Sequence, residues 1–207
     1  MKFFFSCTLC SIFLISCVDD SKSYECIDSV CVEDTDGGYN NLNDCIENCI
    51  ENLQKSNVVV TFFLYENCPI SQYMCGPIRD AYYLFNVTLN SNFVFRGFSP
   101  NMISNSSSLE NFVFEYEIPF NIYSDFDYES NNIGIYTSIY QPVVTPEVFI
   151  EVSDTLIYRG MIDNSYLSIG QWNPPTENYL NFVLNSLATD SDIDYFETDA
   201  VGCLINY

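Results

Sequence analysis

Short apolar runs alternate with polar turns and helical patterns along most of this chain. The run Val58–Tyr65 is rich in β-branched and aromatic residues, which is typical of a buried strand. Similar runs predict further strands at 93–98, 120–123, 144–150 and 156–160. Helical patterns predict helices at 108–117 and 176–187. Thr176 would cap the second of these helices, and together the elements would make up one domain over residues 55–207.

The end of the first strand carries the most informative chemistry. Cys68 follows that strand after a short turn, and Pro69 comes next, which is typical of the first position of a helix. The unpaired N–H groups and the positive dipole end of a helix stabilise a thiolate and lower the thiol pKa from about 8.5 toward neutrality. The alternative is a small, buried and inert cysteine at a turn. We take Cys68 as the candidate nucleophile.

Three motifs follow Cys68-Pro69-Ile70 along the chain: Thr145–Phe149, Tyr158–Asp163, and Thr198 with Gly202–Ile205. In this order the four motifs resemble the thioredoxin-like superfamily. More narrowly, they resemble the bacterial redoxin proteins, which are related to the alkyl hydroperoxide reductase and thiol-specific antioxidant group. The resemblance covers roughly residues 57–207. It implies an α/β, thioredoxin-like fold, with a central mixed sheet flanked by helices.

The resemblance also implies roles for single residues. Pro146 would be a cis-proline that faces Cys68. Thr145 and Pro146, with Pro69 beside the nucleophile, would bind the substrate around its sulfur, partly through main-chain contacts. The activity implied is thiol–disulfide exchange, with a protein or small molecule that carries a thiol or disulfide as substrate.

Several positions depart from the related families. Ser71 occupies the place of thioredoxin's second cysteine, Asn67 that of its tryptophan, and Phe62 that of its buried acid. A Cys-x-x-Ser motif cannot close its own disulfide, so the partner sulfur must come from elsewhere. Peroxiredoxins have a threonine and a proline where this chain has Tyr65 and Thr61. Weak thiol peroxidase activity therefore stays only as an alternative.

The domain over 55–207 contains three cysteines, Cys68, Cys75 and Cys203. In a continuous helix, seven residues at about 1.5 Å each separate the first two Cα atoms by roughly 10 Å, beyond the usual disulfide limit near 7 Å. A kink at Pro77 would weaken this argument. Cys203 lies beside Gly202 on a C-terminal extension, which we expect to be a flexible tail that reaches back over Cys68. We predict a reversible Cys68–Cys203 disulfide with Cys203 as the resolving partner. The alternative is an inert bridge that pins the tail, and the role of Cys75 stays open.

Four further cysteines gather in a small module at 24–54: Cys26, Cys31, Cys45 and Cys49. Asn41 would cap a helix at 42–54 that places the last two sulfurs on one face. We expect these cysteines to form structural disulfides, because so short a segment buries too little apolar surface to fold without them. A zinc site is the alternative. Three pairings are possible, and a local resemblance of 39–49 to the closing helix of Kunitz-type domains favours Cys26–Cys49 with Cys31–Cys45.

The N-terminus has the form of an export signal. Lys2 precedes the apolar stretch Phe3–Ile15, which is too short to span a bilayer. Leu14–Cys17 then has the form of a bacterial lipobox. We therefore expect residues 1–16 to be a lipoprotein signal peptide, Cys17 to carry the lipid, and 17–23 to be a tether. Several acyl chains would make the attachment effectively permanent.

The residues after Cys17 bear on its destination. Val18, rather than an acidic residue, follows the cysteine, and by resemblance to known lipoproteins this favours the outer over the inner membrane. Asp19-Asp20 would be compatible with display at the cell surface instead of the periplasmic face. We expect a lipid-anchored protein of the bacterial cell envelope.

Composition excludes several classes of function. With 6 basic and 28 acidic residues the formal charge is −22, which argues against nucleic acid as a partner because phosphate binding depends on Lys and Arg. Such a charge favours a soluble monomer. The chain has no histidine, so Ser-His-Asp and Cys-His triads and imidazole-ligated metals are excluded. No metal and no cofactor is expected, and a non-catalytic, disulfide-stabilised binding module remains the alternative to an envelope oxidoreductase.

The lipid anchor gives the first testable prediction. Cys17→Ser removes the acylated sulfur, so the protein should move from the membrane fraction to the soluble envelope fraction. Fractionation, with mass spectrometry of the N-terminus, measures this. A Ser variant that still sediments with membranes and keeps residues 1–16 would show that the chain is not a lipoprotein.

Overall fold

The computed structural model describes residues 22–27, 30–52, 58–129 and 131–206. The predicted signal peptide, lipidated Cys17 and most of the tether lie outside these residues. In the part that is described, no helix is long and apolar enough to cross a bilayer.

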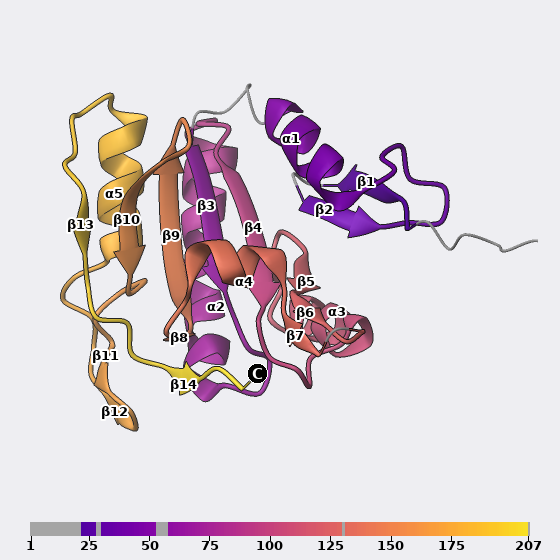
Figure 1. Ribbon diagram of the computed structural model, residues 1–207. Coiled ribbons are helices and arrows are strands. Elements are labelled where there is room, and N and C mark those ends of the chain that lie inside the picture. The colour runs from indigo at the N-terminus through magenta and orange to yellow at the C-terminus, as the bar shows by residue number, and fades with distance from the viewer. Residues whose placement is uncertain (1–21, 28–29, 53–57, 130, 207) are drawn as a thin grey trace, which may run out of the picture.

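A six-stranded mixed sheet forms the centre of the protein, in the order β13-β10-β9-β3-β4-β5 (Figure 1). The strands of this sheet are β3 (Val58–Phe63), β4 (Val94–Ser99), β5 (Ile122–Ser124), β9 (Glu147–Val152), β10 (Thr155–Gly160) and β13 (Phe196–Glu197). β3, β4 and β5 run parallel to one another, β9 is antiparallel to β3, and β10 is antiparallel to β9. The short β13 lies parallel to β10 at the outer edge. The expected central mixed sheet is confirmed.

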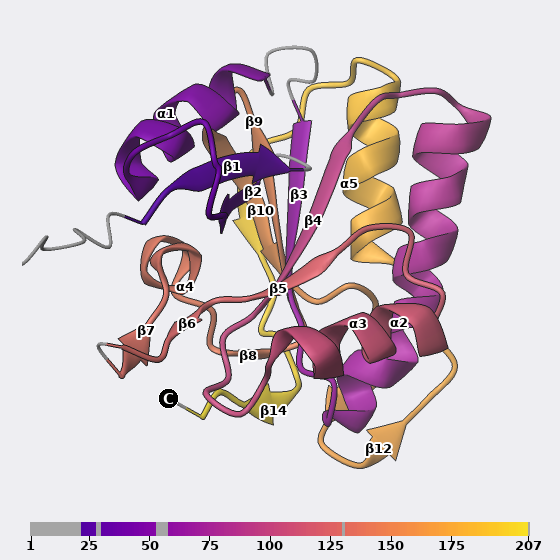
Figure 2. The ribbon, with the colours of Figure 1, turned by 90° about the vertical axis from the view of Figure 1, so that its right-hand side faces the viewer.

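One face of the sheet packs against long helices (Figure 2). The helices of the domain are α2 (Pro69–Tyr82), which continues into the π-helix η2 (Tyr83–Thr88), α3 (Ser106–Glu115), α4 (Ile135–Tyr140) and α5 (Tyr179–Ala188). Side chains alternate along β3, so Val60 and Phe62 join the main core with Ile78 of α2 and Leu180 of α5. Phe63 points to the opposite face.

The opposite face carries a separate aromatic core. Phe63, Phe98 and Phe149 of three adjacent strands pack there against Tyr136 of α4, whose ring lies 4.0 Å from that of Phe98. Arg96 is buried on the same face, where its Nε donates to Thr61 Oγ1 and its guanidinium lies over aromatic rings. A buried cation needs such partners, because leaving it unpaired would be costly.

Helix α4, which the sequence pattern did not predict, is held by a buried carboxylate. Asp125 accepts hydrogen bonds from the backbone N–H groups of Tyr136 and Thr137 and from the Thr137 hydroxyl. The Asp125 carboxylate thus caps the first turn of α4 from another part of the chain. Burial raises the pKa of Asp125 to about 6, although the same hydrogen bonds oppose the shift.

The N-terminal module consists of the hairpin β1 (Tyr24–Ile27) and β2 (Val30–Glu33), followed by α1 (Leu42–Asn52). Asn41 caps α1 as expected, accepting a hydrogen bond from the Asp44 N–H at 2.8 Å. The structure joins Cys26 to Cys49 and Cys31 to Cys45, with Cα separations of 5.4 and 5.9 Å. This is the nested pairing that the Kunitz-like helix favoured, and it leaves none of the four sulfurs for zinc.

The module packs on the aromatic face of the sheet. Val30 is 1% exposed and belongs to the same core as Phe63 and Tyr136. The Cys31 N–H also donates to the Tyr136 hydroxyl. Lys22 forms ion pairs with Glu33 of the hairpin and, beyond the module, with Glu129. An apolar sheet face must be buried against another layer, and here α4 and the module cover it.

The remaining strands are short: β6 (Phe126–Asp127), β7 (Asn132–Ile133), β8 (Val144–Thr145), β11 (Tyr166–Ser168), β12 (Gln171–Trp172) and β14 (Cys203–Leu204). The expected N-cap at Thr176 is wrong. Asn178 caps α5 by accepting from the Asn181 N–H, whereas Thr176 bonds to the side chain of Asn164. The hydroxyl and backbone N–H of Thr176 are thus used in a loop, three residues before the helix begins.

Packing of the module gives a stability prediction. Val30→Ala removes two buried methyl groups that pack on the aromatic face, so the free energy of unfolding should fall by about 2 kcal/mol. Urea denaturation followed by circular dichroism measures this. Val87→Ala is the matched control, because Val87 is 63% exposed and should change stability by less than about 0.5 kcal/mol. If both variants lost the same free energy of unfolding, the packing of the module on the sheet would not contribute to stability.

Candidate redox site

Cys68 lies at the junction that the sequence predicted. It is the N-cap residue of α2 with extended backbone, Pro69 is the first helical residue, and no side chain caps this end. The Cys68 N–H donates to the Tyr65 carbonyl, and its own carbonyl accepts from the Gln72 N–H. The sulfur therefore sits at the positive end of a helix of 14 residues, which favours the thiolate when the thiol is free.

Pro146 follows Thr145, the residue whose carbonyl contacts this sulfur, and the cis bond that the redoxin resemblance implied is present. The Thr145–Pro146 peptide bond is cis and joins β8 to β9. The buried carboxylate of Glu147 holds the turn, because it accepts from the Val143 N–H at 2.7 Å and forms an ion pair with Arg159 at 2.6 Å. Thr145 thereby presents its carbonyl oxygen 3.2 Å from Cys68 Sγ.

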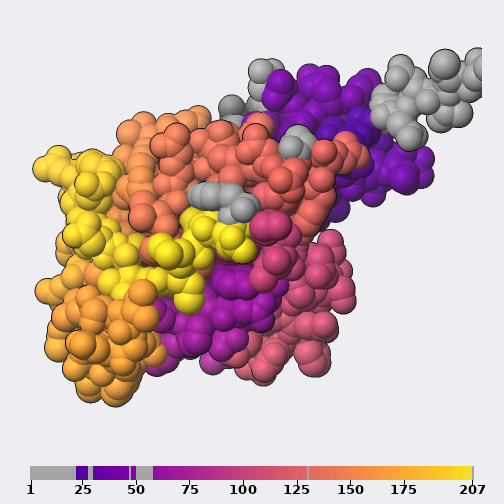
Figure 3. Space-filling view, turned by 60° about the horizontal axis from the view of Figure 1, so that its bottom comes forward, coloured from indigo at the N-terminus to yellow at the C-terminus, as the bar shows by residue number. Residues whose placement is uncertain are grey.

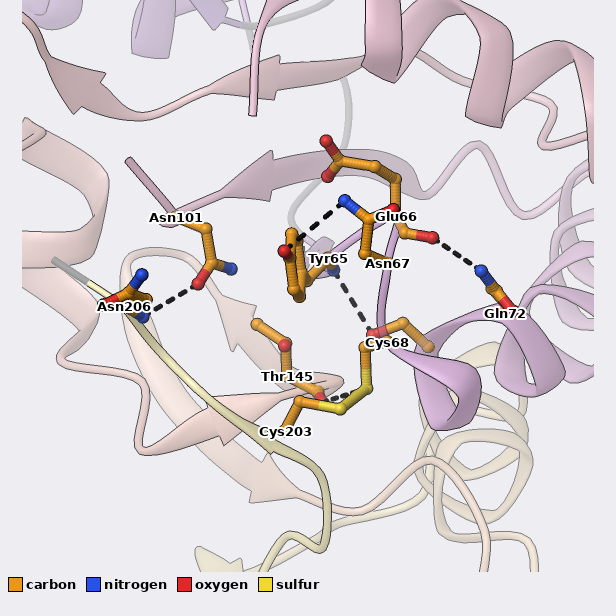
Figure 4. Close-up of a disulfide and its surroundings, with 10 residues drawn as sticks. Tyr65, Glu66, Asn67, Cys68, Gln72, Asn101, Thr145, Cys203 and Asn206 are labelled. Atoms are coloured by element: carbon orange, nitrogen blue, oxygen red, sulfur yellow. Dashed lines mark hydrogen bonds between the residues drawn. A yellow bond between two sulfur atoms is a disulfide. The ribbon is translucent and has the colours of Figure 1, made fainter. Parts of the chain in front are cut away.

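The third component is Cys203, 135 residues away in sequence, which the structure joins to Cys68 with a Cα separation of 5.9 Å (Figure 4). Strand β14 pairs antiparallel with β8, so that Cys203 lies opposite Thr145 and Leu204 opposite Val144. In the disulfide, Cys68 Sγ has no proton, so its approach to the Thr145 oxygen is a van der Waals contact. A free Cys68 thiol could donate a hydrogen bond to that oxygen.

The C-terminal extension is ordered, which corrects the expectation of a flexible tail. Thr198 anchors it: its N–H donates to the Arg159 carbonyl, and its hydroxyl bonds to the Met161 N–H and the Tyr158 hydroxyl, both at 2.8 Å. Gly160 has φ +132, and an added Cβ there would lie 2.2 Å from the Thr198 carbonyl oxygen. The Tyr-Arg-Gly motif at 158–160 therefore packs directly against Thr198, the first residue of the Thr-x-x-x-Gly-Cys motif, and glycine at 160 leaves room for this contact.

Gly202 has a role different from the predicted one. We expected it to loosen the tail, but an added Cβ would lie 2.2 Å from the Thr145 carbonyl oxygen. Its φ is not in the left-handed region. Glycine is thus required because β14 approaches β8 closely, and this approach brings Cys203 within bonding reach of Cys68.

Sequence reasoning missed Asn101, which lies just beyond β4 and beside the tail (Figure 4). Its Oδ1 accepts from the Asn206 N–H at 2.8 Å, and the Met102 N–H donates to the Asn206 carbonyl. The only sequence signal for a role at the site was that Asn101 is a polar residue two positions after the end of β4, the strand next to β3. Asn101 Nδ2 and Thr145 Oγ1 are buried without a hydrogen-bond partner among the described residues, and each such group costs about 1–3 kcal/mol.

Glu66 is a second residue that sequence reasoning missed. Its side chain is largely buried and accepts hydrogen bonds from the Ser104 and Ser108 hydroxyls at 2.7 and 2.8 Å. Its backbone carbonyl accepts from the Gln72 side chain. These contacts fix the loop that carries Cys68 against α3 and the first turn of α2.

Cys75 is buried and unpaired. Its thiol donates to the Ser71 carbonyl at 3.1 Å, and burial raises the pKa of the Cys75 thiol to about 12. Helix α2 continues through Pro77, and Cys68 is bonded to Cys203 rather than to Cys75. At neutral pH almost none of this thiol is thiolate, and it is not a candidate for exchange.

No metal site accompanies these sulfurs. Among the described residues, no group of three or more Cys, Asp or Glu side chains is arranged to hold an ion.

Comparisons with known proteins bear on the fold. No protein-family model and no curated protein matches the chain. A hypothetical protein from Sinorhizobium meliloti superposes with a TM-score of 0.62 at 15% identity, covering 76% of this chain and 84% of that one. An uncharacterised conserved protein from Geobacillus kaustophilus gives 0.58 at 19% identity, covering 73% and 78%.

The central mixed sheet, the cysteine at the start of α2 and the cis-proline before β9 are those that the sequence resemblance implied. The chain has a thioredoxin-like fold. A secreted disulfide oxidoreductase from Mycobacterium tuberculosis is also similar, with a TM-score of 0.42 at 16% identity over 65% of this chain and 81% of that one. That likeness is too weak to carry an argument about activity. The thioredoxin-like fold positions the site, and its function must be argued from the site itself.

The tight fit of Gly202 gives a prediction about the bridge. Gly202→Ala should destabilise the Cys68–Cys203 disulfide relative to the dithiol by roughly tenfold or more, which raises its reduction potential by about 30 mV. Titration against thiol–disulfide buffers, with mass spectrometry of the bridge, measures this. Gly38→Ala is the control, since an added Cβ there meets nothing within 4 Å. An unchanged potential in Gly202→Ala would show that β14 does not set the geometry of the bridge.

Proposed function

We propose that this protein is a thiol–disulfide oxidoreductase of the bacterial cell envelope, with Cys68 as the attacking thiolate and Cys203 as its resolving partner. The observation that carries the proposal is the position of Cys68. It lies at a helix N-terminus without a side-chain cap, contacts the residue that precedes the cis-proline, and is bonded to a second sulfur, Cys203. In the reduced protein, Cys68 attacks a substrate disulfide and forms a mixed disulfide. Cys203 then attacks Cys68 Sγ, which releases the substrate as a dithiol and restores the bridge.

Two local effects act on the Cys68 thiolate. The N-terminus of α2 favours it, whereas the Thr145 carbonyl 3.2 Å away accepts a hydrogen bond from the thiol and so favours the protonated form. The balance of the two effects matters for exchange, because the rate depends both on how much thiolate forms and on how nucleophilic that thiolate is.

An envelope location is supported by the lipobox at Leu14–Cys17 and by the two bridges of the module. Disulfides persist in oxidising compartments and are rare in the cytosol. The lipid on Cys17 would anchor the protein to a membrane, with the outer membrane favoured. Substrates would be proteins or small molecules that contain a thiol or a disulfide.

The competing function is structural: the bridge would only pin the C-terminus of a binding module. One measurable property separates the two. A working bridge should titrate above about −300 mV, whereas a structural bridge titrates below it. The full burial of Cys68 would suit an inert bridge, and its position at the helix start favours exchange.

Cysteine variants test the exchange. In an assay with a fluorescent peptide disulfide and a dithiol reductant, Cys68→Ser should lower the rate roughly 100-fold or more, because the nucleophile is lost. Cys203→Ser should accumulate a mixed disulfide between Cys68 and the peptide, visible by mass spectrometry. Cys75→Ser is the control and should leave the rate unchanged, since Cys75 is buried and protonated. A rate that survives Cys68→Ser would refute the proposed role.

A further inference from the structure

In the disulfide form the site is closed by its own chain. Cys68 and Thr145 are both 0% exposed, although Thr145 lies in a two-residue strand outside the main sheet. The cover is the segment 199–206, which we call the strap, and Figure 3 shows the end of the chain lying across this face of the molecule. No substrate can reach Cys68 Sγ while the strap is in place.

Few contacts other than the disulfide hold the strap. Strand β14 forms only two residue pairs with β8, and Asn206 is bonded to Asn101 and Met102. Leu204, its large apolar residue next to the bridge, is 79% exposed. Val201 and Cys203 pack against the main core but are only partly buried. Apolar burial, which normally holds a segment in place, is therefore modest in the strap.

The closed state also leaves polar groups unpartnered. Thr145 Oγ1 and Asn101 Nδ2 belong to two residues that contact the strap, and neither atom has a hydrogen-bond partner among the described residues. Opening the strap would let water hydrogen-bond to both. This difference favours the open state once the covalent bond is gone.

The anchor at Thr198 sets where such an opening would begin. Thr198 is tied to the Arg159 carbonyl, the Met161 N–H and the Tyr158 hydroxyl, on the firmly packed strand β10 and the turn that follows it. Beyond it, Asp199 is exposed and Ala200 and Val201 are only partly buried. The hinge therefore lies between Thr198 and Gly202, and β13 stays with the sheet.

We propose that the strap is a redox-controlled cover: the Cys68–Cys203 bond closes the groove beside Pro146, and reduction of the bond releases residues 199–206 and uncovers Cys68. The inference rests on the proposed function. It adds that the oxidised protein cannot engage a substrate at Cys68, whereas the reduced protein can.

The exposures also assign the sulfur at which reduction begins. Cys68 is fully buried and Cys203 is partly exposed, so the thiolate of a dithiol reductant attacks Cys203 Sγ. The S–S bond breaks, and Cys68 leaves as the thiolate that the N-terminus of α2 stabilises. The second thiol of the reductant then displaces Cys203, which takes up a proton, and the reductant ends as a disulfide after giving up two electrons.

Hydrogen–deuterium exchange with mass spectrometry tests the cover without any substrate. The samples are the oxidised protein, the oxidised protein treated with a dithiol, and Cys203→Ser, whose module bridges stay intact. Amides of 199–206 should exchange roughly tenfold or more faster in the second and third samples than in the first. Peptides from α5 should be unchanged, which shows that the fold is kept. Cys75→Ser, which retains the bridge, should keep the protection of 199–206.

Unchanged protection of 199–206 in Cys203→Ser and in the reduced protein would overturn the proposal. If α5 also loses protection in Cys203→Ser, Cys68→Ala replaces it, because this change breaks the bridge from the other side and leaves the strap sequence intact. The readout is independent of turnover. A strap that opens in a protein with no exchange activity would count against the proposed function alone, and an active protein whose strap stays closed would count against this inference alone.

Discussion

The main-chain carbonyl of Thr145 is the point at which three distant segments meet. Cys68 Sγ lies 3.2 Å from it, β14 pairs alongside it, and Gly202 approaches it so closely that no side chain would fit between them. Main-chain groups make this junction, so its geometry depends on the backbone course set by the cis-proline and by Glu147 with Arg159. A change at any of the three segments must therefore disturb the other two.

Local sequence carried enough information to predict where Cys68 lies in the fold. A buried strand, a short turn and Cys-Pro fix the position of Cys68 within a few residues, because strand and helix signals there are strong and adjacent. The ordered tail could not be predicted in the same way. Its path depends on how Thr198 hydrogen-bonds to Tyr158 and Met161. These contacts join residues about 40 positions apart, and the hydrophobic pattern along the chain predicts only local structure.

The same distinction explains the other misses. Asn101 serves the site only because β4 neighbours β3 in the sheet and because the chain returns to it at Asn206. Helix α4 has only six residues, and so short a sequence carries little helical signal of its own. The helix is stabilised by Asp125, which caps it from another segment of the chain. The cysteine pattern at 24–54 predicted a small module held together by disulfides. Its packing through Val30 on the aromatic face became visible only in three dimensions.

That packing has a consequence for the order of maturation. The module can present Val30 to Phe63 and Phe149 only when β1, β2 and α1 are held together, and the two nested bridges do this. Before those bonds form, α4 alone covers the aromatic side of the sheet, and apolar rings remain exposed to water. Completion of the fold is thus coupled to oxidation, so a chain whose module cysteines are still reduced would stay short of its final stability.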